Sequence, residues 1–297
     1  MNILGTRKIW FVVSSILLIV GIVSISVFGY KTGIDFAGGT ILEIQAEESK
    51  IPNTDSRQLI IDAYKDKIGL DVAVQTTEAG RYFVRSNQIS NDQKNEVIEY
   101  LKQKFNLVEE LRFESVDPTI GTDVVRKAIL ALIVAVIGIL LYLAYAFRRV
   151  PKELGSFRFG TAAIMATLHD VLILLGLYAI VGRFWGAEID GMFITALLTV
   201  VGFSTHDTIV TFDRIRENLR RRPGDDLEVV VNDSIIETII RSISTSVTLL
   251  FVLIAMFFFG GATLKFFTLA LIIGVFFGVY SSIFIASPLL LWGIKKR

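Results

Sequence analysis

Residues 7–45 read RKIWFVVSSILLIVGIVSISVFGYKTGIDFAGGTILEIQ and join two kinds of structure in one stretch. Residues 9–28 form an apolar run of about 20 residues, the length that a helix needs to cross the hydrocarbon core of a membrane. Gly38 and Gly39 follow, and residues 40–45 then alternate between apolar and polar side chains, as a half-buried strand does. This stretch therefore predicts a membrane helix followed by a small folded domain.

The same run has some features of a cleaved signal peptide, because Arg7 and Lys8 precede it and residues 24–26 read Ser-Ile-Ser. The apolar region of a signal peptide is, however, only about 7–15 residues long. We therefore expect an uncleaved membrane anchor.

Long apolar runs recur along the whole chain. Of its 297 residues, 53% are hydrophobic and 20% are charged, whereas ordinary globular domains are about 45–50% apolar and about 25% charged. Six runs are long enough to span a membrane: residues 9–28, 128–147, 159–181, 192–212, 240–259 and 266–291. The alternative, a soluble enzyme with an unusually apolar core, does not explain so many runs. We expect an α-helical polytopic membrane protein with six transmembrane helices.

Motifs of enzymes and of metal sites are missing from the sequence. There is no cysteine, so neither a disulfide nor a thiolate metal site can form. There is no HExxH motif, and Asp170 with Asp207 makes only a speculative hydrolytic pair. The glycines of residues 33–39 follow a membrane helix and lack the Gly-Lys-Ser/Thr of a phosphate loop, so we read them as a turn. We expect no catalytic residue, no bound metal or cofactor and no nucleic-acid partner.

Positive charges near the ends of the spans predict the orientation, because loops rich in Lys and Arg stay on the cytoplasmic side. They gather before the first span, between the second and third, between the fourth and fifth, and at the C-terminus: Arg7, Lys8, Arg148, Arg149, Lys152, Arg158, Arg214, Arg216, Arg220, Arg221, Arg222, Lys295, Lys296 and Arg297. The other connections carry fewer. We therefore expect both termini in the cytoplasm and residues 30–122 outside it.

Residues 30–122 are enough for one small domain between the first span (residues 1–29) and a five-helix bundle (residues 123–297). Alternation, capping residues and turn glycines predict the order β-α-β-β-α-β: residues 40–45, 56–68, 71–75, 81–85, 91–104 and 108–116. This order is the signature of a ferredoxin-like α+β fold. An unrelated α+β domain with one element misread is the alternative.

Two charged side chains lie deep in the predicted spans. At 1.5 Å per residue, Asp207 is roughly 24 Å from the outer end of the fourth helix and Arg241 roughly 28 Å from that of the fifth. Both therefore fall on the cytoplasmic side of a core about 30 Å thick, where adjacent antiparallel helices can pair them. Near the midplane of the third helix, His169 and Asp170 form a second polar pair.

Hydroxyl groups accompany these charges. Arg241, Thr245 and Thr248 share one helical face, flanked by Ser242 and Ser246. Thr199 and His206 share a similar face of the fourth helix. Buried ionisable groups in a span commonly mark ion or proton pathways, which predicts a relay through Asp207, Arg241, His206, Asp170 and His169, supported by Thr245, Thr248 and Thr199. Two alternatives remain: a static buried pair, and an Arg241 that extends to lipid phosphates.

The last span carries a small residue at every fourth position: Ala270, Gly274, Gly278, Ser282 and Ala286. Small residues with this spacing let two membrane helices approach closely. We expect a packing surface there, without a chemical role.

Four stretches give a recognisable pattern: GIDFAGGT at 33–40, LHDVLILLG at 168–176, GFSTHDTIVTFDRIREN at 202–218 and ETIIRSISTS at 237–246. In this order, over nearly the whole chain, they resemble the SecF branch of the SecD/SecF protein-export family, in the RND superfamily of proton-driven transporters. In that family a fourth-helix aspartate and a fifth-helix arginine are implicated in proton transport, and they match Asp207 and Arg241. Two positions depart from the usual pattern: His206 replaces an asparagine, and Asp117-Pro118 replaces glycine-proline.

The resemblance implies an accessory of the bacterial inner membrane that works with SecD and the SecYEG channel. It would use an ion gradient, of H⁺ or Na⁺, to complete translocation of an unfolded polypeptide after the ATPase SecA has driven insertion. A further carboxylate would come from SecD. Two other hypotheses stay open: a static intramembrane scaffold of the translocon, and a small RND-type exporter, which a single six-helix half disfavours.

Overall fold

The computed structural model describes residues 2–47, 55–76, 80–147 and 156–292, and the chain divides into two compact units. One unit comprises residues 1–31 and 130–297, and the other comprises residues 32–129. Six helices in the described residues are long and apolar enough to cross a membrane. The expected class, a polytopic helical protein with a small α+β domain, is confirmed.

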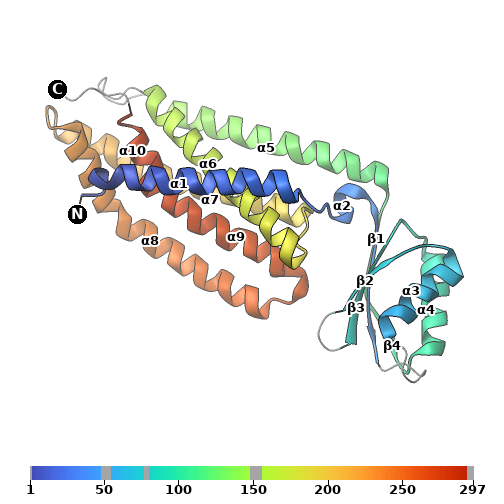
Figure 1. Cartoon of the computed structure of the whole chain (residues 1–297). Coiled ribbons are helices and arrows are strands. Elements are labelled where there is room, and N and C mark those ends of the chain that lie inside the picture. The colour runs from blue at the N-terminus through green and yellow to red at the C-terminus, as the bar shows by residue number, and fades with distance from the viewer. Residues whose placement is uncertain (1, 48–54, 77–79, 148–155, 293–297) are drawn as a thin grey trace. The chain divides into compact units, whose positions relative to one another are not determined.

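The smaller unit holds one antiparallel sheet of four strands in the order β2-β3-β1-β4 (Figure 1). Its strands are β1 (Gly39–Ala46), β2 (Ala73–Thr76), β3 (Arg81–Ser86) and β4 (Val108–Val116). Helix α3 (Ser56–Ile68) joins β1 to β2, and helix α4 (Asn91–Lys104) joins β3 to β4. This order confirms the ferredoxin-like prediction.

The capping residues explain where the two helices begin. The Asp55 side chain accepts a hydrogen bond from the backbone N–H of Arg57, and Ser90 forms a capping box with Gln93. Between these helices and the sheet lies a core that includes Leu42, Ile44 and Tyr64, each 0% exposed. Burial raises the pKa of the Tyr64 phenol well above its usual value.

Gly38 and Gly39, the second of which begins β1, are needed where the backbone turns from the short helix α2 (Ile34–Ala37) into the sheet. Gly38 and Gly39 have φ values of +74° and +120°. A Cβ on Gly38 would lie 2.6 Å from the Cα of Pro118, and one on Gly39 would lie 2.8 Å from the carbonyl oxygen of Ser86. Only glycine fits both the backbone conformation and the space.

Helix α5 (Pro118–Ala146) begins at this contact. The carboxylate of Asp117 accepts hydrogen bonds from the Thr119 N–H at 2.8 Å and the Thr119 hydroxyl at 2.5 Å. Both hydrogen bonds lower the pKa of Asp117, and the bond from the Thr119 hydroxyl has the larger effect. The Asp117-Pro118 pair, which replaces the usual glycine-proline, therefore caps and begins helix α5.

The larger unit is a bundle of long helices, in which α1, α6, α7, α8 and α9 run side by side (Figure 1). They are α1 (Arg7–Phe28), α6 (Ser156–Trp185), α7 (Gly191–Arg221), α8 (Leu227–Phe259) and α9 (Ala262–Ser281). A 3₁₀ turn (Leu4–Thr6) precedes α1; a π-helical segment (Ser282–Ala286) and the short α10 (Ser287–Leu289) follow α9. Stacked and edge-on rings of Phe147, Phe159 and Phe212 fill one part of the bundle core.

Glycines set the closest helix contacts. A Cβ on Gly176 of α6 would lie 2.2 Å from the Cα of Gly21 on α1. On α9, Cβ atoms on Gly274 and Gly278 would lie 2.1 Å from the nearest side-chain atom of Val200 and 3.1 Å from that of Ser204, both on α7. The small-residue ladder of the last span is therefore a packing surface, as predicted.

Candidate functional site

Asp207 lies in the seam between α7 and α8 and is 5% exposed. Its Oδ1 atom accepts a hydrogen bond of 2.7 Å from the hydroxyl of Ser242 on α8. Its Oδ2 atom is buried and has no hydrogen-bond partner among the described residues. The site thus contains a carboxyl group with one oxygen held and the other open to a new partner.

Arg241 is next to Ser242 in the chain but faces away from the seam. Successive residues of a helix point about 100° apart, so a buried Ser242 turns Arg241 to the outside. Arg241 is exposed, and none of the ion pairs formed by the described residues includes it. In this chain Asp207 therefore bonds to Ser242 and is not brought to Arg241.

The other polar residues expected near Asp207 also lie on exposed faces. On α7, His206 and Thr199 are exposed, and the Thr199 hydroxyl donates to the carbonyl oxygen of Thr195 on its own helix. On α8, Thr245 and Thr248 are exposed and likewise bond to backbone carbonyls of α8. The structure thus separates the predicted relay residues into a buried carboxyl and an exposed polar face.

His169 and Asp170 are both buried, at 5% and 1% exposure, between α6, α7 and α9. Asp170 Oδ1 lies 2.9 Å from His169 Nδ1. Its Oδ2 accepts hydrogen bonds from Ser204 of α7 at 2.5 Å and from Ser281 of α9 at 2.6 Å. The Asp170 carboxyl group, with three polar contacts, ties three helices together at one point.

Buried hydroxyl groups line the seam beside Asp207. Ser242 and Ser246, expected only as flanking residues, continue at four-residue spacing to Thr238 and Ser234, which the sequence reasoning did not single out; all four are buried. Across from them, α7 contributes Thr211 and Asn218, which are 1% and 2% exposed. The four-residue spacing of these hydroxyl residues is visible in the sequence. It continues from the predicted span back into the polar stretch that precedes it, and it could have identified this face.

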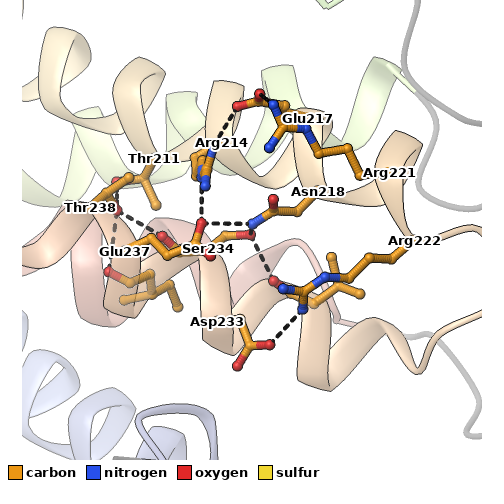
Figure 2. A network of polar contacts seen from close by, with 12 residues as sticks. Thr211, Arg214, Glu217, Asn218, Arg221, Arg222, Asp233, Ser234, Glu237 and Thr238 are labelled. Atoms are coloured by element: carbon orange, nitrogen blue, oxygen red, sulfur yellow. Dashed lines mark hydrogen bonds and ion pairs between the residues drawn. The ribbon is translucent and has the colours of Figure 1, made fainter.

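A charged network closes the end of this seam (Figure 2). Arg214 of α7 bonds to Glu237 of α8 and, at 2.6 Å, to Glu217, which also pairs with Arg221. Arg222 reaches Asp233 across the helix pair at 2.8 Å. Ion pairs from the DRIREN stretch (residues 213–218) and from Arg222 therefore hold α7 against α8 beyond the apolar part of both helices.

Six apolar spans, a ferredoxin-like domain and carboxyl groups buried between helices define a polytopic membrane protein of the transporter kind. A family model described as "Protein export membrane protein SecD/SecF, C-terminal" matches residues 96–296, and "SecD/SecF GG Motif" matches residues 24–50. The chain belongs to the SecD/SecF family, in its SecF branch, and is a SecF subunit of the Sec export machinery. It is thus a multi-pass protein of the cell membrane, in a family of transporters.

Curated relatives match almost end to end. The protein translocase subunit SecF of Thermobaculum terrenum is 43% identical, with 97% of this chain and 92% of the relative covered. SecF of Anaerolinea thermophila is 40% identical, with 98% and 94% covered.

Longer proteins contain the same region. The crystal structure of SecDF from Thermus thermophilus superimposes with a TM-score of 0.81 at 32% identity, covering 98% of this chain and 38% of that one. The SecDF of Brucella abortus is 32% identical, with 91% of this chain and 34% of the relative covered. The chain therefore spans little more than a third of these fused proteins, and the fusions imply association with SecD.

Proposed function

We propose that this chain, together with SecD, uses the transmembrane ion gradient to complete translocation of unfolded polypeptide through SecYEG. The coupling ion in this proposal is H⁺, with Na⁺ as the alternative. Asp207 takes up and releases the ion, and no cofactor is required. The pair His169 and Asp170 belongs to the same polar interior.

The environment of Asp207 carries the proposal. An ionisable side chain inside a membrane is costly, and where it occurs it commonly marks an ion or proton pathway. Asp207 is held through one oxygen by Ser242, and its second oxygen has no partner among the described residues. This oxygen is a ready acceptor for a proton.

The exposed polar face supports a site that is completed by a partner. His206 and Arg241 lie on exposed surfaces of α7 and α8, within the membrane spans. Leaving such groups against lipid is costly, so they need cover from another polar surface or from water. SecD, which is joined to the SecF region in the fused relatives, is the partner we assign to this face.

The orientation belongs to the proposal too. We infer that both termini and the α7–α8 connection lie in the cytoplasm of a bacterium, with residues 30–122 outside, because connections rich in Lys and Arg stay on the cytoplasmic side. The outer domain would then meet the emerging polypeptide, and ion passage through the residue 123–297 bundle would drive its movement. A static scaffold would need the same partner contacts but no ion passage.

Replacing Asp207 with asparagine tests the proposal. Asp207→Asn keeps the size and the contact with Ser242 but cannot take up a proton at this position. With the variant reconstituted beside SecD at matched levels, we expect at least a ten-fold loss of ion conductance and loss of gradient-dependent translocation.

The matched control is Asp213→Asn on the same helix, where the carboxylate pairs with Arg216 at 2.5 Å and is largely exposed. We expect it to behave as the wild type. Ion dependence that survives Asp207→Asn would contradict the relay. Loss of the complex in place of loss of conductance would support the scaffold.

A further inference from the structure

The polar seam between α7 and α8 continues beyond Asp207 to the polar ends of both helices. On α8, Ser242, Thr238 and Ser234 are 1%, 7% and 0% exposed. On α7, Thr211 and Asn218 are buried opposite them. Hydroxyl groups across a helix pair can serve as packing contacts, but leucine or alanine would serve that purpose without the cost of burying polar atoms. Buried polar groups that extend from beside the Asp207 carboxyl to the polar ends of both helices therefore point to a further role.

In this row one contact joins two hydroxyl groups, and the others run to backbone carbonyl oxygens. The Thr211 hydroxyl lies 3.4 Å from the Asp207 carbonyl oxygen, to which it donates, and 3.4 Å from the Thr238 hydroxyl. Thr238 in turn donates to the Ser234 carbonyl oxygen at 3.0 Å. Each hydroxyl can both donate and accept, and it rotates to suit its partners. Such groups can accept a proton on one side and release another on the other side.

The row ends at a carboxyl group that reaches water. The Asn218 amide donates to the Ser234 hydroxyl at 3.0 Å and to Glu237 Oε2 at 2.9 Å (Figure 2). Glu237 also receives a hydrogen bond from Arg214, and 33% of its side chain is exposed. It therefore stands between the buried row and the solvent.

Two buried oxygen atoms without a hydrogen-bond partner in the described part of the chain indicate where water would bind in the seam. Asp207 Oδ2 and Ser246 Oγ are both buried and have no hydrogen-bond partner among the described residues. Buried polar atoms in folded proteins are nearly always hydrogen-bonded, to protein or to ordered water. Both atoms lie on the seam-facing sides of α7 and α8, so water within the seam would satisfy them.

We propose that the α7–α8 seam is the proton exit from Asp207, with Thr211 and Thr238 as its relaying hydroxyls and Glu237 as its last carboxyl. The O–H bond of protonated Asp207 breaks, and its proton passes to water or hydroxyl oxygen in the seam. Each oxygen that gains a proton releases another toward Glu237. Protonated Glu237 then loses its proton to water, so both carboxylates are restored and one proton has moved. This route rests on the proposed function, because it begins at Asp207.

The contacts favour H⁺ over Na⁺ for this route. The hydroxyl groups of Thr211 and Thr238 lie 3.4 Å apart, so a proton can pass between them when they rotate, whereas a sodium ion would have to separate them. The seam is therefore a route for protons alone.

Threonine-to-valine substitutions test the route, because valine keeps the shape of threonine and removes its hydroxyl. In vesicles containing the chain with SecD, proton flux is measured under an imposed pH gradient. We expect Thr238→Val and Glu237→Gln each to lower the flux at least ten-fold, and Thr238→Ser to restore it to within about two-fold. The control is Thr167→Val on α6, whose hydroxyl bonds to the Ala163 carbonyl oxygen of its own helix; we expect wild-type flux.

Complex yield and thermal unfolding are measured for every variant. If Thr238→Val lowers these, Thr211→Val provides the second test of the same row. Wild-type flux in a correctly assembled Thr238→Val or Thr211→Val variant would overturn the route, as would flux carried by Na⁺. If Asp207→Asn abolishes flux while the valine variants keep it, the route fails and the proposed function stands. If Asp207→Asn also keeps its flux, the proposed function itself fails.

Discussion

Two pairs of neighbouring residues show how the helical turn sorts the polar groups of this protein. His206 and Asp207 are adjacent on α7, and Arg241 and Ser242 are adjacent on α8. In each pair one residue is buried in the seam and the other is exposed. The buried members bond to each other at 2.7 Å, so the exposed members are left for contacts outside this chain. The site is therefore divided between the interior of the subunit and its surface.

At the scale of elements, apolar runs and capping residues were sufficient to predict the six spans, the ferredoxin-like order and the packing ladder of the last span. Helix ends were less well predicted: α7 continues to Arg221 and α8 begins at Leu227, because ion pairs across the two helices support them beyond the apolar runs. On α8, Ser242 and Ser246 were expected only beside the Arg241 stripe, and Thr238 and Ser234 on the same inward face were missed. Helix α8 has two polar stripes: one includes Ser242 and is buried, and the other includes Arg241 and is exposed. Sequence periodicity identifies such stripes but does not show which of them another helix covers.

The contact between α1 and α6 makes a prediction about helix packing. Gly176→Ala would place a methyl group against the backbone of Gly21, which can yield only if the helices separate. Overpacking of this kind costs about 1–3 kcal/mol, so we expect a lower thermal unfolding temperature in detergent. Gly138→Ala on α5, where the added Cβ has nothing within 4 Å, is the control and should unfold as the wild type does. Equal unfolding temperatures for the two variants would mean that α1 and α6 are not this close.

At the scale of the whole molecule, this subunit contains the buried carboxyl groups of Asp207 and Asp170 and an exposed polar face, and it covers only part of the fused relatives. The Thermus thermophilus SecDF structure contains a region of this fold within a chain more than twice as long. A subunit that leaves His206 and Arg241 exposed within its spans is best explained as part of a larger membrane assembly. Its ion chemistry and its partner contacts would then share one surface.

That shared surface can be tested with single cysteines, because the chain has none of its own. Thr245→Cys places a thiol on the exposed polar face of α8, one turn from Arg241. Thiols react with maleimide as thiolates, so the labelling rate reports access to water. With SecD bound, we expect labelling at this position to slow at least ten-fold relative to the chain alone. Asp225→Cys, in the exposed connection between α7 and α8, should be labelled equally in both states. Equal rates for Thr245→Cys with and without SecD would place the partner on another face of the bundle.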